Sequence, residues 1–111
     1  MYKVVIRVNA SDINELLANI PTLRAKLSEK YKCSGTTTSF ICISGNDMLI
    51  KIIPTLLKSD KSMGGSESLV PALRPYFVII IESQILSKLL EAWNLITETL
   101  KNLGLRYVLI E

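Results

Sequence analysis

The chain has 111 residues, carries a formal net charge of +3, and contains two cysteines and no histidine. Histidine is the commonest general base and metal ligand near neutral pH, so its absence excludes Ser–His and Cys–His catalytic arrangements and imidazole-containing zinc sites. Hydrophobic residues make up 49% of the chain and aromatic residues only 6%, which indicates a core of Ile, Leu and Val. We therefore predict a single domain over residues 1–111 with no catalytic residues, no metal site and no cofactor.

Two elements are predicted near the N-terminus. Apolar residues alternate with others over residues 3–8, which predicts a half-buried strand. Over residues 13–31 apolar residues recur at helical spacing, and Asp12 followed by Glu15 is typical of a helix start. Pro21 falls inside this pattern, and proline lacks the amide hydrogen that a helix interior needs. We expect a kink at that point or two short helices.

The middle of the chain predicts a second strand and a hairpin. β-branched residues are concentrated in 36–44, as in strands. The apolar run that follows fits either a strand over 48–53, paired across a turn at 45–46, or a helix over 48–57. Because Pro54 would break that helix in its middle, the hairpin is favoured.

The second half contains a loop, two strands and a long helix. The polar, glycine-containing stretch 59–72 is predicted to be a mobile loop. The continuous apolar run 76–81 predicts a central strand covered on both faces. A helix is expected to begin with Ser83 as its cap and to end at Gly104, and 106–110 closes the chain as a strand.

This order of elements fits an α+β fold of the ferredoxin-like sandwich type, with two helices on one face of an antiparallel sheet. No apolar run approaches the roughly 18–20 residues that span a bilayer, and the N-terminus shows no cleavage-site pattern. A cytoplasmic protein with no membrane partner is expected.

The two cysteines are Cys33 and Cys42, which are too far apart in sequence for a C-x-x-C motif. We expect Cys42 to be a buried strand residue and Cys33 to be a loop thiol. A disulfide between them is the alternative in an oxidising compartment.

The last helix carries more apolar residues than one stripe requires to cover a sheet. Either they form one wide stripe that packs wholly into the core, or Leu86, Leu90 and Trp93 line an association surface. Tryptophan is a favoured anchor of such surfaces, so these three residues are the candidate protein interface.

Two further surfaces are candidates for nucleic acid. The densest basic stretch is either a solvated helix face or a contact to the phosphates of RNA; it consists of Arg24, Lys26, Lys30 and Lys32. The outer sheet face is expected to carry Lys3, Val5, Arg7, Phe40, and Arg106 or Lys51. RNA-binding sheets need stacked aromatics, and only Phe40 and Phe77 are available, so pairing of two such sheets is favoured over RNA binding.

The strand and helix over 4–17, the hairpin from 40–45 into 49–52 and the long closing helix resemble the small dimerising subunit of the KEOPS tRNA-modifying complex. The resemblance implies a non-catalytic subunit that dimerises, docks its helices onto a catalytic partner and aids tRNA binding. It covers element order and apolar pattern and includes no diagnostic motif.

The chain departs from that family in three places. Residues 54–75 would be an insertion, 105–110 add a terminal strand, and residues 88–91 stand where a Leu-Arg pair is expected early in the last helix. No functional residue is therefore carried over from the family.

We predict a non-catalytic interaction and dimerisation module, an accessory subunit of a larger complex that forms a homo- or heterodimer with another protein subunit and contacts RNA indirectly. The alternative is a homo-oligomeric domain that senses a small molecule bound between subunits near 59–72.

Overall fold

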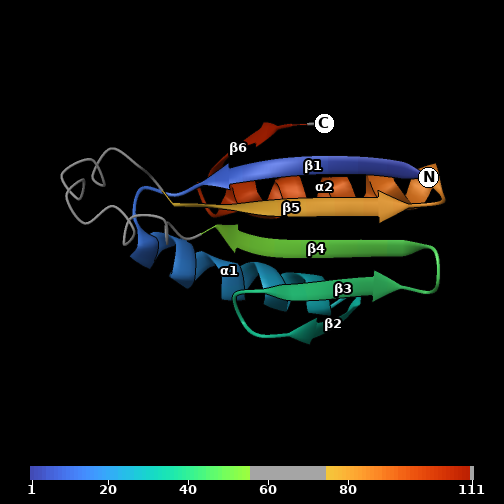
Figure 1. The fold of residues 1–111 in the computed structure, drawn as a ribbon, viewed down its shortest axis with the longest axis horizontal. Helices are drawn as coiled ribbons and strands as arrows, with labels where there is room; N and C mark the ends of the chain where they lie inside the picture. Colours follow the sequence, from blue (N-terminus) through green and yellow to red (C-terminus); the bar gives the residue numbers. More distant parts are fainter. Residues whose placement is uncertain (56–74, 111) are drawn as a thin grey trace, which may run out of the picture.

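The computed structural model describes residues 1–55 and 75–110, which form a six-stranded antiparallel sheet and two helices (Figure 1). The strand order across the sheet is β2-β3-β4-β5-β1-β6. In chain order the elements are β1 (Tyr2–Asn9), α1 (Ile13–Ser28), β2 (Lys32–Gly35), β3 (Phe40–Ser44), β4 (Met48–Thr55), β5 (Tyr76–Ser83), α2 (Leu86–Asn102) and β6 (Arg106–Leu109).

Both helices lie on the same face of the sheet, so the described residues form two layers (Figure 1). α1 packs near β2 and β3, whereas α2 packs against β5, β1 and β6, and the two helices contact each other. The predicted α+β class is confirmed, and the arrangement is compatible with a ferredoxin-like sandwich. Neither described helix is long and apolar enough to cross a membrane.

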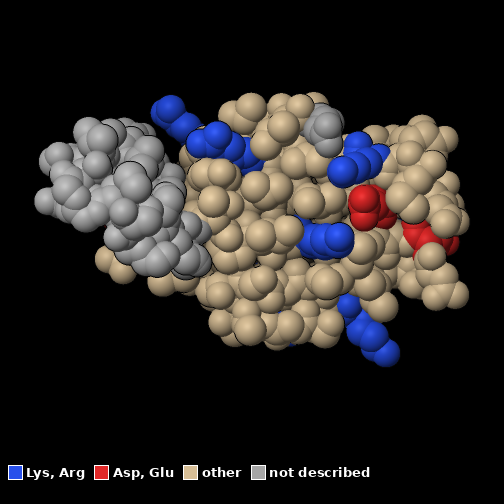
Figure 2. All heavy atoms as spheres, viewed as in Figure 1, with Lys and Arg blue, Asp and Glu red and all other residues tan. Residues whose placement is uncertain are grey.

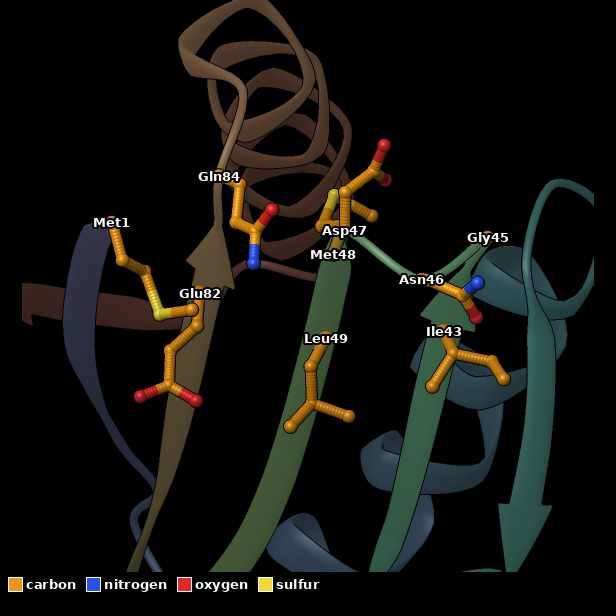
Figure 3. Close-up of a pocket in the computed structure, with 9 residues that line it drawn as sticks. All are labelled: Met1, Ile43, Gly45, Asn46, Asp47, Met48, Leu49, Glu82 and Gln84. Atoms are coloured by element: carbon orange, nitrogen blue, oxygen red, sulfur yellow. The ribbon is translucent and has the colours of Figure 1, made fainter.

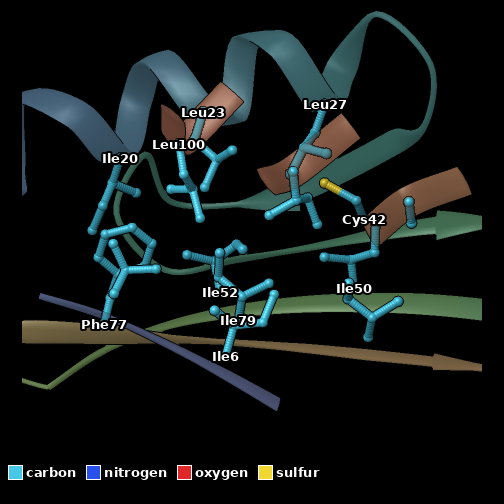
Figure 4. Close-up of a cluster of buried hydrophobic side chains, with 14 of the residues drawn as sticks. Ile6, Ile20, Leu23, Leu27, Cys42, Ile50, Ile52, Phe77, Ile79 and Leu100 are labelled. Carbon is cyan, nitrogen blue, oxygen red and sulfur yellow. The ribbon is translucent and has the colours of Figure 1, made fainter. Parts of the chain in front are cut away.

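The core lies between the sheet and the helices and consists mostly of aliphatic side chains (Figure 4). Alternation along each strand sends every second side chain toward the helices, which is why the period-two patterns are buried on this side. The largest fully buried side chains are Ile6, Leu16, Ile20, Leu23, Leu27, Ile50, Ile52, Phe77, Ile79, Ile81, Ile96 and Leu100.

α1 begins as predicted. The Asp12 carboxylate accepts a hydrogen bond from the Glu15 amide at 2.8 Å, and the Glu15 carboxylate accepts one from the Ser11 amide. The prediction of two short helices is wrong, because α1 continues through Pro21 to Ser28. Packing of its buried face against the sheet outweighs the loss of one hydrogen bond within the helix.

The predicted strand over 36–44 is also wrong in its first half. β2 and β3 form a hairpin, and Gly35 at its turn has a φ of +118°. Cys33 is therefore a strand residue opposite Cys42, and the two sulfurs form a disulfide. The prediction of a loop thiol at Cys33 is therefore wrong. It failed because a strand as short as β2 leaves no clear pattern in the local composition.

The hairpin that leads into β4 is confirmed, and the alternative helix over 48–57 is excluded for residues 48–55. Gly45 lies in its turn with a φ of +59°. Pro54 lies beyond the last β3–β4 residue pair, so one side of β4 has no neighbouring described strand there. The predicted loop at 59–72 lies outside the described residues.

The connections of α2 differ at its two ends. Ser83 does not cap the helix as predicted, because it is the last residue of β5, and its hydroxyl binds the backbone of Ile85 instead. At the C-terminal end, the Leu105 amide donates to Leu100 and Gly104 has a φ of +75°. This is a Schellman ending, as the glycine predicted.

Candidate interaction surfaces

One side of α2 exposes large apolar residues. Leu86 and Leu90 are 46% and 50% exposed, and Trp93 is partly buried against the core. These positions are four and three residues apart and therefore share one side of the helix. The Lys30–Glu91 ion pair joins α1 to the other side of α2, so the exposed stripe faces away from α1.

β6 extends this apolar stripe. The Trp93 and Tyr107 rings meet edge to face with centroids 6.3 Å apart, and Leu109 lies on the same face of β6 as Tyr107. We name this the α2–β6 surface; it consists of Leu86, Leu90, Trp93, Tyr107 and Leu109, and none of its residues is charged. A polar hollow of about 430 Å³ adjoins it, lined by Asn94, Thr97, Glu98, Lys101 and Tyr107.

The β6 backbone leaves one row of polar groups unpaired with the sheet. The Ile110 amide donates to the Val5 carbonyl at 2.8 Å, so Ile110 directs its backbone toward β1. Because this direction alternates along a strand, Val108 also faces β1, whereas Tyr107 and Leu109 face away. In the described part of the chain no strand lies beyond β6.

The opposite face of the sheet carries no described helix and forms an open surface (Figure 2). The prediction that β5 is covered on both faces is therefore wrong for the described residues. Ile41, Ile43 and Ile53 are each a little over 40% exposed on this surface. The cross-strand pairing places Lys51 beside Ile41 and Ile80 on the same face.

The aromatic residues expected on the open face are not there. Phe40 is 2% exposed and Phe77 is 1% exposed, because both point into the core. Base stacking on this sheet therefore has no phenylalanine to use. Lys3 and Arg7 are exposed, and Arg7 lies over the Tyr76 ring at 4.1 Å.

A shallow hollow of about 220 Å³ lies at one end of the open face (Figure 3). Its floor combines apolar Ile43 and Leu49 with the Glu82 carboxylate. The Asp47 carboxylate at its margin accepts a hydrogen bond from Lys88 at 2.7 Å. The hollow has no histidine or cysteine and provides no nucleophile paired with a base.

Three of the four basic residues that are candidates for nucleic-acid contact have partners among the described residues. The Arg24 guanidinium donates to the carbonyls of Gly35 and Thr36 at 2.9 and 2.6 Å. Lys30, just after α1, pairs with Glu91 of α2; Lys26 pairs with Glu29, and Lys32 lies in β2. Most of this positive charge is engaged within the protein.

The described residues contain no group of three or more His, Cys, Asp or Glu side chains that could hold a metal ion. Among the described residues, Tyr31 has a raised pKa, because of its burial and secondarily because of the negative charge of Glu91. Tyr31 belongs to the buried hydrophobic core, so its raised pKa reflects core packing rather than a reactive site.

Of the five residues of the α2–β6 surface, the sequence pattern had indicated Leu86, Leu90 and Trp93 as a candidate interface but not Tyr107 and Leu109. The indication was present, because residues 107–110 are apolar on both strand faces. A scan against protein-family models finds no match, and searches of curated proteins and of solved structures find none.

Proposed function

We propose that this protein is a non-catalytic association module that binds another polypeptide through the α2–β6 surface. The observation that carries the proposal is that three elements of one patch, namely the α2 stripe, the Trp93–Tyr107 pair and the β6 edge, are apolar and adjacent. Contiguous exposed apolar surface with a polar margin is typical of protein interaction sites.

Burial of Leu86 and Leu90 favours binding, but the free energy gained is too small to drive association by itself. Burying the exposed half of Leu86 or Leu90 would contribute roughly 1 kcal/mol each. Association costs about 4 kcal/mol or more in lost translational and rotational freedom. Further contacts from the partner are therefore needed, and β6 offers them through its side chains and its backbone.

The topology of the sheet is consistent with such a module. The order β4-β5-β1-β6 within the sheet, with helices after β1 and β5, supports a ferredoxin-like sandwich extended by the β2–β3 hairpin. Such a two-layer module is suited to serve as an accessory subunit of a larger complex. A tRNA-related role would rest only on the resemblance in element order and apolar pattern, so we propose association with protein and no role in tRNA binding.

The test compares two double variants of matched exposure. Leu86→Ser with Leu90→Ser alters the α2–β6 surface, whereas Ile41→Ser with Ile43→Ser alters the open face, whose isoleucines are 41% and 42% exposed. We expect the first pair to weaken association about tenfold or more and the second to leave it unchanged. Light scattering on the purified protein and pull-down from the native host measure self-association and association with other chains. Equal effects of the two pairs would contradict the proposal.

A further inference from the structure

We infer that the partner at the α2–β6 surface is a second copy of this chain, paired antiparallel through β6 so that two six-stranded sheets become continuous. This inference rests on the proposed function and adds the identity and geometry of the partner.

The backbone of β6 requires a strand as its partner. The amides and carbonyls of Tyr107 and Leu109 face away from β1, as the hydrogen bond from Ile110 to Val5 shows. Unpaired strand groups beside apolar side chains are satisfied, with water excluded, by another extended chain. A helix or a small molecule would leave those groups unpaired.

The short edge is complementary to itself. A two-fold axis at Val108 places Tyr107 of one copy opposite Leu109 of the other, and Leu109 opposite Tyr107. Both residues of each pair face the free edge, so each pair exchanges two hydrogen bonds. The same register places Arg106 opposite Ile110, so no basic residue of β6 meets its own copy.

The side chains agree with this pairing on both faces. On the helix side, the α2–β6 surfaces of the two copies meet, and none of the five residues in this surface is charged; the charged residues of the adjoining hollow, Glu98 and Lys101, have opposite signs. On the open side, Val108 and Ile110 are each 54% exposed and would cover each other across the axis. The same surface of each copy therefore forms both sides of the interface, as two-fold symmetry requires.

The experiment changes the charge at the two-fold axis. Val108→Glu and Val108→Lys each place like charges opposite one another in the dimer, whereas an equimolar mixture places opposite charges there. Val108 is 54% exposed and lies beside Arg7, so the monomer tolerates Glu at this position. We expect a dimer for the wild type, at least about tenfold weaker self-association for each variant, and recovery in the mixture. Sedimentation over about 1 to 500 µM covers the relevant range of affinity.

A second measurement does not depend on charge. Val108→Cys should form an intermolecular disulfide under mild oxidation, because residues facing each other at a non-hydrogen-bonded pair have Cα atoms about 4.5 Å apart. The matched control is Ile53→Cys on the open face, which is 43% exposed and should remain monomeric in the same gel assay.

The outcomes separate this inference from the proposed function. Association that responds to Leu86 and Leu90 but not to the Val108 charges or cross-link overturns β6 pairing and leaves the association module intact. A wild-type monomer over the whole concentration range overturns the second copy as partner, and the pull-down then tests the module with other chains. Insensitivity to both sets of variants overturns both.

Discussion

The two edge strands of the sheet, β2 and β6, differ in how well their backbone is protected from pairing with another strand. The Thr36 amide bonds to Ser39, so Cys33 and Gly35 of β2 direct their backbone to the free edge. There Arg24 binds the Gly35 carbonyl, and Cys33 is tied to β3 by the disulfide. β6 has no comparable protection from the described residues, and its side chains from Tyr107 to Ile110 are apolar and exposed.

One sheet can therefore prevent strand pairing at one edge and permit it at the other. Short edge strands, basic side chains and covered carbonyls are recognised ways to prevent strand pairing. β2 has all three features, whereas β6 is short and begins with the exposed Arg106, but the carbonyls of Tyr107 and Leu109 at its free edge are not covered by described residues. Substitutions that weaken the protection of β2 should lower the stability of the protein by amounts that depend on which feature is removed.

Gly35→Ala should destabilise the β2 edge most. A Cβ at this position would lie 2.7 Å from the Ser39 oxygen, and its φ of +118° is unfavourable for any L side chain. We expect a loss of roughly 3 kcal/mol in the free energy of unfolding, measured by urea denaturation. Gly104→Ala, before β6, is the control. Its φ is +75°, but a Cβ at this position would have no atom within 4 Å, so the loss in unfolding free energy should be only about 1 kcal/mol.

Reduction of the Cys33–Cys42 disulfide should cost less. The two cysteines are separated by 9 positions, and opening a loop of that size restores about 2–3 kcal/mol of unfolded-state entropy. Urea midpoints with and without reductant measure the loss, and Cys33→Ser with Cys42→Ala serves as a permanently reduced comparison. An unchanged midpoint would show that strand pairing, packing and the Arg24 hydrogen bonds hold β2 without help from the disulfide.

Arg24→Met should cost about 1–2 kcal/mol, because the carbonyls of Gly35 and Thr36 each lose a donor. Lys26→Met is the charge-matched control and should change stability by less than about 0.5 kcal/mol, because its Glu29 partner lies 3.9 Å away at an exposed surface. Thermal unfolding and salt-dependent RNA binding of both variants test whether Arg24 is structural. Loss of RNA affinity at unchanged stability would favour the predicted basic interface.

Tyr31→Phe, just before β2, should have the smallest effect and raise stability. The Tyr31 hydroxyl is buried without a hydrogen-bond partner in the described structure, so its removal should add up to about 1 kcal/mol. The raised pKa also makes the wild type lose stability as the pH rises above 10.0, because the unfolded tyrosine ionises first. The Phe variant lacks that component. The ordinary pKa of tyrosine is 10.0. If the difference in unfolding free energy between the wild type and Tyr31→Phe did not change with pH above 10.0, this assignment would be contradicted.

Local pattern was sufficient for much of this protein. The period of two predicted β1, helical spacing predicted α1 and α2, and Asp12 and Gly104 correctly indicated helix ends. These features depend on contacts within a few residues of the chain. The same patterns identified Leu86 and Leu90 as apolar residues beyond what the core needs.

Only the tertiary structure decided which faces and edges remain open. Phe40 points into the core, Cys33 lies in a strand opposite Cys42, and Arg24 donates hydrogen bonds to carbonyls at the β2 edge. A strand's own periodicity describes the two sides of that strand, but it contains no information on which strand lies beside it or which layer covers it. Strand order is set by contacts between distant segments, and it left β6 as an apolar edge next to α2.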